Sequence, residues 1–127
     1  SINTRNNKEL YKHDFKKPAQ LIDILIAQKM DDLLKEVVSS GTGKKASIKD
    51  MNLAGKTGTT QNHKDAWFIG YTNEYIIGIW IGNDDGSLMK KATGGSGPAT
   101  IFKTLAQNIH QNKNKASIEA LLRNLEN

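Results

Sequence analysis

Apolar residues recur at helical spacing in the first third of the chain, each three or four positions after another. They are Ile22, Leu25, Ile26, Met30, Leu33, Leu34 and Val37. This periodicity predicts an amphipathic helix from about Ala19 to Ser39, with Pro18 in its first turn and glycines directly after its end. We expect the apolar face of this helix to pack into the core of the domain.

Three strand candidates follow the predicted helix in close order. Residues 53–60 are small and rich in threonine, residues 66–72 read AWFIGYT, and residues 75–82 read YIIGIWIG. The last two flank Asn73-Glu74, a two-residue connection typical of a β-hairpin. Because residues 75–82 are apolar on both faces, we expect this strand near the middle of a covered sheet.

The N-terminal segment carries a weaker strand pattern. Asn6-Asn7 separates two short runs that bear Ile and Tyr, and Asn tolerates the positive φ of tight turns. This pattern indicates a hairpin within residues 1–14.

The C-terminal segment is predicted to be helical in two pieces. Pro98 begins a helix to about Gln111, and Asn112 to Lys115 is interpreted as a polar joint. A second amphipathic helix is expected to carry Ile118, Leu121, Leu122 and Leu125. We therefore divide the chain into a domain portion, residues 1–112, and a C-terminal helical tail, residues 113–127.

Composition narrows the classes of function. The 127 residues carry a net charge of +5, but the lysine doublets are scattered and only Arg5 and Arg123 are arginines, which argues against a nucleic-acid partner. Cysteine is absent from the sequence and His13, His63 and His110 are far apart, so we expect no metal site and no cofactor. No apolar run reaches the roughly 18 residues of a membrane helix, so any membrane anchor would lie upstream.

The stretch LAGKTGTT at residues 53–60 invites comparison with a phosphate-binding loop. That loop requires G-x-x-x-x-G-K-[ST], and here the first glycine would stand at position 50. Position 50 is Asp50, whose carboxylate would repel phosphates, and no apolar strand precedes it. The phosphate-loop interpretation therefore fails on spacing, charge and context.

The same stretch is surrounded by further short motifs. AGKTGTT is followed by DAWFIGYT (65–72), IGIWIGNDDG (77–86) and TGG (93–95), and VVSSGTG (37–43) precedes it. Together these segments resemble the penicillin-binding proteins, and they are similar to the transpeptidase domain of the bifunctional (class A) members over about residues 20 to 110. The resemblance implies an α/β fold with an antiparallel sheet flanked by helices on both faces, five strands in the family, of which this chain would hold the last three.

The KTG strand presents a cation, two hydroxyls and an unobstructed glycine on one short edge. Gly58 lets an extended peptide approach the backbone closely and pair with it as an added strand. Lys56 supplies a point charge for a carboxylate, or lowers the pKa of a nearby hydroxyl. By resemblance, Lys56 helps to organise a serine site, Thr57 and Thr59 bind the terminal carboxylate of D-Ala-D-Ala or penicillin, and the Thr59 N–H belongs to the oxyanion hole.

The family's other two motifs have no credible match in this sequence. Ser87-Leu88-Met89-Lys90 fits S-x-x-K, which carries the nucleophile, but it follows KTG and lies in an expected glycine-bearing loop. Ser1-Ile2-Asn3 fits S-x-N at the extreme terminus. We therefore expect the C-terminal part of a transpeptidase domain, which carries one side of the site without the nucleophile and is inactive alone.

The resemblance implies a parent protein that cross-links peptidoglycan by serine acylation at D-Ala-D-Ala and binds β-lactams. Class A members also carry a glycosyltransferase domain and an anchor upstream, which implies the cytoplasmic membrane with the domain facing the periplasm or cell exterior. The missing N-terminal part of the same domain would be a partner. A serine β-lactamase relative and a non-catalytic interaction or sensor module remain open, and so does the role of Asp65.

Overall fold

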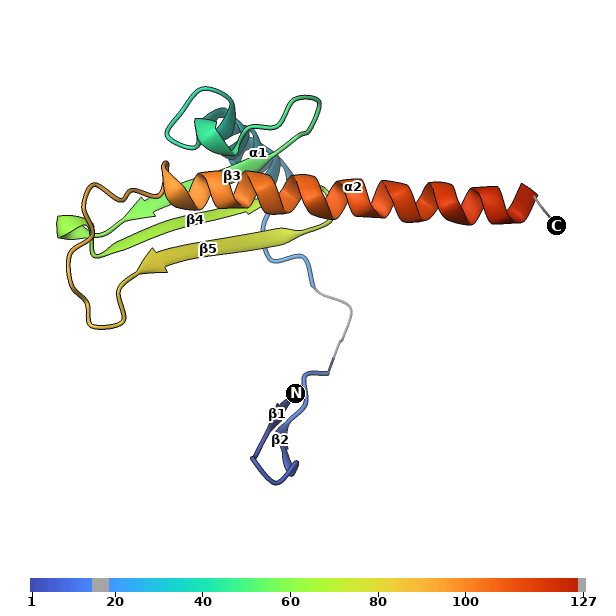
Figure 1. The fold of residues 1–127 in the computed structure, drawn as a ribbon, viewed down its shortest axis with the longest axis horizontal. Helices are drawn as coiled ribbons and strands as arrows, with labels where there is room; N and C mark the ends of the chain where they lie inside the picture. The colour runs from blue at the N-terminus through green and yellow to red at the C-terminus, as the bar shows by residue number, and fades with distance from the viewer. Residues whose placement is uncertain (15–18, 126–127) are drawn as a thin grey trace.

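The computed structural model describes residues 1–14 and 19–125 (Figure 1). In chain order its elements are β1 (Ile2–Asn3), β2 (Glu9–Tyr11), α1 (Ile24–Ser39), the short 3-10 helix η1 (Lys44–Ala46), β3 (Ala54–Thr59), the short 3-10 helix η2 (Gln61–His63), β4 (Asp65–Tyr71), β5 (Ile76–Gly82) and α2 (Gly97–Leu125). The β1–β2 hairpin confirms the N-terminal prediction, with Asn7 at a φ of 57°. Figure 1 draws this hairpin apart from the other elements. Pro18 lies outside the described residues.

The three predicted strands form one antiparallel sheet with the order β3-β4-β5. The connection at Asn73-Glu74 is confirmed as the β4–β5 turn, where the Thr72 N–H donates to the Tyr75 carbonyl at 2.9 Å. The expected central position of β5 is not seen among the described residues, where β5 is an edge strand that pairs with β4 alone. Apolar residues on both faces of a strand indicate two faces to be covered, but they do not identify a neighbouring strand.

Helix α2 covers one face of the sheet, and the core lies between them. Phe68 of β4 and Phe102 of α2 are fully buried, with ring centroids 4.9 Å apart. Gly70 is required beside them, because a Cβ there would lie 2.7 Å from Phe68 Cε1 and 2.8 Å from Phe102 Cε2. The buried cluster is completed by Val38, Ala46, Leu53, Ala99 and Ala106.

The opposite face of the sheet is covered by α1 only near Ala54 and Tyr71, and its remainder on β4 and β5 is exposed in the part of the chain that the structure describes. Side chains alternate between faces along a strand, so Trp67 and Ile69 of β4 point away from α2. Trp80 of β5 pairs across the strands with Trp67, and the ring centroids are 6.2 Å apart. Exposed fractions of these side chains are 42% for Trp67, 52% for Ile69, 82% for Ile76 and 43% for Trp80.

Helix α1 confirms the predicted helix and its end at Ser39, but the predicted start near Ala19 is wrong by five residues, and most of the apolar face is not buried. It begins at Ile24 because Asp23 caps it, with Oδ1 accepting from the Leu25 N–H at 2.8 Å. Val38 is its one buried residue, whereas Leu25, Met30 and Leu33 are each more than half exposed. Periodicity identified a face suited to burial. Leu34 and Val37 on that face are half-buried, and the described residues leave the rest of it exposed.

Helix α2 is continuous from Gly97 to Leu125, so the predicted polar joint at residues 112–115 is wrong. Residues 112–115 contain no glycine or proline, and an asparagine costs a helix less than about 1 kcal/mol relative to alanine. Lys113 is also held by an ion pair with Glu74 at 2.6 Å. The division into a domain portion and a helical tail stays a prediction.

Candidate functional site

Strand β3 turns the peptide groups of two residues toward its free edge, Thr57 of the KTG motif and Thr59 directly after it. The Thr60 N–H donates to the Asp65 carbonyl at 3.1 Å, which makes these residues a hydrogen-bonded pair beyond the end of the ladder. Hydrogen-bonded pairs alternate with non-hydrogen-bonded pairs along an antiparallel ladder. Thr57 and Thr59, which lie opposite Phe68 and Ala66, therefore direct their N–H and C=O groups away from β4. No other strand of the described residues pairs with this edge.

Lys56 and the two threonines lie on opposite faces of β3. Lys56 is opposite Ile69 on the open face, whereas Thr57 and Thr59 point to the face that α2 covers. The exposed Lys56 side chain returns to the strand edge, where Nζ donates to the Thr57 carbonyl at 2.9 Å. The structure thus brings the ammonium group and the outward peptide groups of β3 together at one edge.

Both threonine hydroxyls are held by groups from other segments. Thr57 Oγ1 lies 2.9 Å from Oγ1 of Thr42, in the turn after α1. Thr59 Oγ1 accepts a hydrogen bond from the Gly94 N–H at 3.1 Å, in the loop before α2. Three segments far apart in the sequence therefore meet at the KTG motif.

The loop at residues 93–97 packs against Gly58 without room for a side chain. A Cβ at Gly94 would lie 2.1 Å from the Trp67 carbonyl oxygen and 2.6 Å from the Gly58 carbonyl oxygen. The Ser96 hydroxyl closes the loop by donating to the Thr93 carbonyl at 2.7 Å. At Gly58 itself, a Cβ would lie 3.2 Å from Trp67 Cβ, which is a tight contact.

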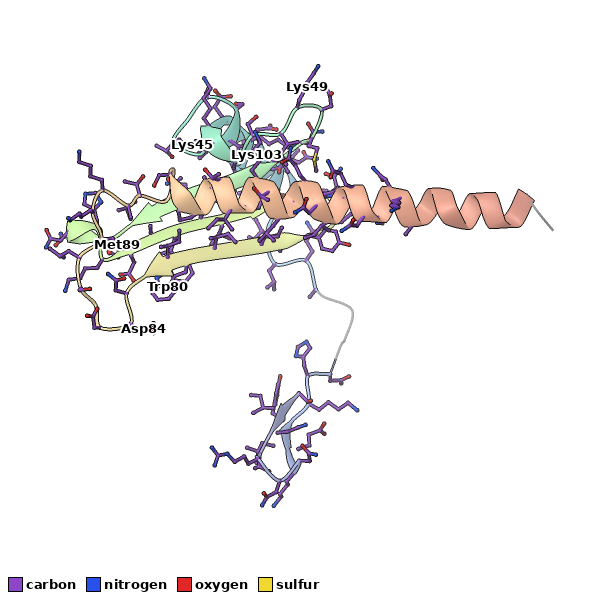
Figure 2. All side chains as sticks on the ribbon, in the orientation of Figure 1. Lys45, Lys49, Trp80, Asp84, Met89 and Lys103 are labelled. Atoms are coloured by element: carbon purple, nitrogen blue, oxygen red, sulfur yellow. The ribbon has the colours of Figure 1, made fainter. Side chains whose placement is uncertain are left out.

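Asp65 links the end of β3 to β5. Its Oδ2 accepts from the Thr60 hydroxyl at 3.0 Å, and its Oδ1 accepts from Trp80 Nε1 at 3.0 Å. Its own N–H donates to Thr60 Oγ1 at 2.8 Å. Trp80 is labelled in Figure 2, near the turn that carries Asp84. The sequence left the role of Asp65 open, and these contacts assign it to the geometry of the turn after the KTG strand.

Thr42 and Gly94 were not singled out from the sequence as functional residues. Both lie in segments that contributed to the family resemblance, GTG at 41–43 and TGG at 93–95. The signal was therefore present as a motif, but its contact with Thr57 or Thr59 depends on the path of a loop. Spacing alone does not give that path.

The two rejected motif matches lie outside this site. Ser87 to Lys90 form an irregular segment after β5, where Ser87 Oγ accepts from Asn83 Nδ2 at 2.9 Å. Ile2 and Asn3 belong to the β1–β2 hairpin. A hollow of about 500 Å³ is lined by Gly82, Asn83, Asp84, Asp85 and Ser87, and none of these residues belongs to β3.

The described residues show neither a metal-binding cluster nor a membrane-spanning helix. They contain no group of three or more His, Cys, Asp or Glu side chains placed to hold a metal ion. No helix among them is long and apolar enough to cross a membrane.

A contact between α1 and β4 shifts the pKa values of two residues. Hydrogen bonds from Lys35 and from the Tyr71 hydroxyl, the latter 2.9 Å away, hold the pKa of Asp31 below its ordinary value. Burial, followed by the bond to Asp31, raises the pKa of Tyr71. This contact fixes α1 against the sheet at the end of β4, opposite Ala54 of β3.

Two curated relatives illustrate how this chain compares in sequence. Penicillin-binding protein 1A of Pseudomonas aeruginosa is 45% identical over 69 residues, which are 53% of this chain and 8% of that protein. Penicillin-binding protein 1B of Buchnera aphidicola is 38% identical over 104 residues, which are 80% of this chain and 14% of that protein. The chain thus spans about one tenth of the length of these relatives.

Two solved structures share the fold. The D,D-transpeptidase domain of a peptidoglycan glycosyltransferase from Eggerthella lenta aligns with a TM-score of 0.57 and 25% identity, covering 88% of this chain and 26% of that one. The transpeptidase domain of a D,D-transpeptidase from Legionella pneumophila aligns with a TM-score of 0.53 and 28% identity, covering 69% of this chain and 36% of that one. The predicted fold class, an antiparallel sheet flanked by helices, is confirmed.

A family match covers most of the described fold. Residues 3–107 match the family described as the penicillin binding protein transpeptidase domain. The match runs from the N-terminal hairpin into α2 and includes β3, Thr42 and the loop at 93–97. The chain therefore belongs to the penicillin-binding protein transpeptidase family, as part of a transpeptidase domain of the class A kind.

Proposed function

We propose that this chain forms the KTG side of the active site of a peptidoglycan D,D-transpeptidase. The observation that carries the proposal is the outer edge of β3, where the peptide groups of Thr57 and Thr59 point away from β4. An extended stem peptide that ends in D-Ala-D-Ala pairs with such an edge as an added strand. The family match and the named relatives support this assignment.

The reaction is acyl transfer through a serine that lies in another part of the domain. The serine Oγ attacks the carbonyl carbon between the two D-Ala residues, the C–N bond breaks, and the serine proton passes to the departing D-Ala amine. An amine of a neighbouring stem then takes the acyl group from the serine, which recovers its proton. A β-lactam reacts at the same serine, and its opened ring stays attached.

Each KTG residue has a role in this reaction. Lys56 supplies positive charge beside the serine and the substrate carboxylate. The hydroxyls of Thr57 and Thr59 donate to that carboxylate, and Gly58 leaves the strand edge unobstructed. The outward Thr59 N–H is one donor of the oxyanion hole, which stabilises negative charge on the carbonyl oxygen of the tetrahedral intermediate.

The rest of the transpeptidase domain is the partner of the open surfaces. Trp67, Ile69 and Trp80 on the sheet and the apolar face of α1 are exposed, and exposed apolar patches of this kind mark surfaces that another part of a protein covers. The chain covers 26% of the Eggerthella lenta transpeptidase chain, which leaves ample sequence to cover them. Further strands beside β5 would turn its free edge into the interior of a larger sheet.

The setting of the parent protein follows from the same assignment. The parent carries a glycosyltransferase domain and a membrane anchor upstream of this chain, and it places the transpeptidase domain outside the cytoplasmic membrane. Its substrates are the stem peptides of peptidoglycan, and β-lactam antibiotics are its inhibitors.

The complete protein that contains this chain tests the proposal. It is incubated with fluorescent penicillin and, separately, with a stem pentapeptide plus an acceptor amine. We expect a stable covalent adduct in the first reaction and a cross-linked product with release of D-Ala in the second. Rapid turnover of penicillin would indicate a β-lactamase relative instead, and an adduct without D-Ala release would indicate a sensor. Absence of any adduct would overturn the proposal.

A further inference from the structure

We propose that Thr42 is a positioning residue for the substrate carboxylate, acting through the hydroxyl of Thr57. The inference rests on the proposed function of β3 and adds a residue outside the KTG motif. Its starting observation is the 2.9 Å distance between Thr42 Oγ1 and Thr57 Oγ1, which joins residues fifteen positions apart in the chain.

The turn that carries Thr42 is tightly fixed to the end of α1. The N–H groups of Ser40 and Gly41 both donate to the Glu36 carbonyl, at 3.0 and 3.1 Å. The Gly43 N–H donates to the Val37 carbonyl at 2.9 Å. These bonds satisfy carbonyls that a helix end would otherwise leave unpaired. The backbone on both sides of Thr42 is therefore held by α1.

Glycines on either side of Thr42 allow this close fit. A Cβ at Gly41 would lie 2.9 Å from Val37 Cα, and one at Gly43 would lie 3.1 Å from Phe68 Cε2. From the opposite direction, a Cβ at Gly95 would lie 2.4 Å from the Thr42 carbonyl oxygen. The two glycines thus fit closely against α1 and the Phe68 ring, and the loop before α2 lies against the Thr42 carbonyl, while Thr42 itself is exposed.

The number of protons on each hydroxyl decides the direction of the hydrogen bond. A threonine hydroxyl carries one proton and two lone pairs. A carboxylate only accepts, so Thr57 must direct its single proton to the substrate. The Thr42 hydroxyl then has to donate to Thr57 Oγ1, since two oxygens 2.9 Å apart need one proton between them.

Thr59 shows the same arrangement with a fixed donor. The Gly94 N–H can only donate, so Thr59 Oγ1 accepts and the Thr59 proton is free for an outside acceptor. Thr42 supplies to Thr57 what the backbone of Gly94 supplies to Thr59. The Gly94 N–H orients the Thr59 hydroxyl before substrate arrives, whereas the substrate carboxylate selects the direction of the Thr42–Thr57 bond. A donor chain that ends on a charge is strengthened by polarisation.

The test measures acylation of the complete protein by benzylpenicillin and by its methyl ester. Thr42→Val removes the hydroxyl and keeps the branched shape, Thr42→Ser keeps the hydroxyl, and Thr104→Val on the exposed side of α2 is the matched control. Thr42→Ala replaces the valine variant if that protein does not fold. Thr42→Val is also combined with Thr57→Val in a double variant.

We expect Thr42→Val to slow acylation by benzylpenicillin about three- to tenfold, which is the range of one hydrogen bond. Thr42→Ser and Thr104→Val should stay within about twofold of the parent, and Thr42→Val should cause no further loss once Thr57 is valine. The ratio of the rate with benzylpenicillin to the rate with its ester should fall in Thr42→Val, because the ester lacks the charged acceptor.

Several results would overturn the inference. One is an acylation rate of Thr42→Val equal to that of the parent, and another is a Thr42→Ser rate as low as that of Thr42→Val. The inference also fails if Thr42→Val slows acylation as much in the Thr57→Val background as in the parent. It fails as well if Thr42→Val slows the reactions with benzylpenicillin and with its ester equally. If the parent protein itself forms no adduct, the proposed function fails and this inference fails with it. Adduct formation by the parent separates the two outcomes.

Discussion

At the scale of single residues, the candidate site depends on groups outside the KTG motif. The hydroxyls of Thr57 and Thr59 are held by Thr42 and by the Gly94 N–H, and Asp65 holds the turn that follows them. Lys56 is the exception, because its Nζ bonds to the carbonyl of its own neighbour. Its charge is therefore available to whatever binds along the strand edge.

Replacement of Lys56 by alanine should impair acylation of the complete protein by penicillin. Loss of one charge-assisted contact corresponds to about a ten- to hundredfold lower rate. Lys64→Ala is the matched control, since Lys64 is an exposed lysine in the turn between β3 and β4. A Lys56→Ala rate within about threefold of the parent would show that this lysine is not at the site.

The contacts of Asp31 with Lys35 and with Tyr71 should make stability depend on pH. The pKa of Asp31 is lowered in the folded state, so its contribution is present above the ordinary value of 3.8 and is lost as pH falls through the folded value. Asp31→Asn should lower the melting temperature of the complete protein at pH 7 by about 1–2 °C, as for a largely exposed pair. That difference should vanish in acid. Asp32→Asn on the same turn is the control, and an equal effect of both variants at pH 7 would contradict the assignment.

At the scale of elements, the sequence predicted where strands and helices occur more reliably than it predicted which elements lie beside each other. Strands β3 to β5, the Asn73-Glu74 turn and α1 followed from alternation, turn residues and period. The edge position of β5 did not, because hydrophobicity reports suitability for burial and not which element covers it. The polar residues 112–115 suggested a break in α2, yet solvent-facing positions tolerate them within a helix.

Contacts between loops and β3 were also beyond prediction from sequence. Motif resemblance pointed to Lys56, Thr57, Gly58 and Thr59 together with the segments around Thr42 and Gly94. It did not show that these segments bond to the threonines, because that depends on how two loops cross the end of the sheet. The role of a motif residue can be assigned from its position in the motif. The contacts that support it from other segments are seen only in the structure.

The loop before α2 provides a prediction at this scale. Gly94→Ala should displace the loop from β3, because its Cβ would lie 2.1 Å from the Trp67 carbonyl oxygen. The Thr59 hydroxyl would then lose its donor, and acylation should fall about three- to tenfold. Gly78→Ala in β5 is the control, since a Cβ there has its nearest contact at 3.9 Å. Parental acylation in Gly94→Ala would show that the loop does not support the site.

At the scale of the whole molecule, the described residues form one side of a domain. One sheet face is packed against α2, while the other carries exposed Trp67 and Trp80 beside the exposed apolar face of α1. Burial of one large side chain contributes about 1.5–3 kcal/mol, against a typical folding stability of about 5–15 kcal/mol. The open surfaces therefore remove a large share of the stabilisation that a domain needs.

Residues 1–127 produced alone should associate or fold poorly. The free edge of β5 and the exposed apolar side chains beside it form a template for pairing with another chain. Sedimentation equilibrium gives the association state, and near-UV circular dichroism of the two Trp residues reports tertiary packing. A monomer with a cooperative melt would show that these elements are sufficient for a stable domain.

The central claim is that this chain supplies the KTG side of a site whose nucleophile lies elsewhere in the same domain. Peptide mapping by mass spectrometry, after the complete protein has reacted with benzylpenicillin, tests it most directly. The account predicts one acylated serine outside residues 1–127, and no adduct on the isolated chain. An adduct on a serine within residues 1–127, Ser87 included, would contradict it.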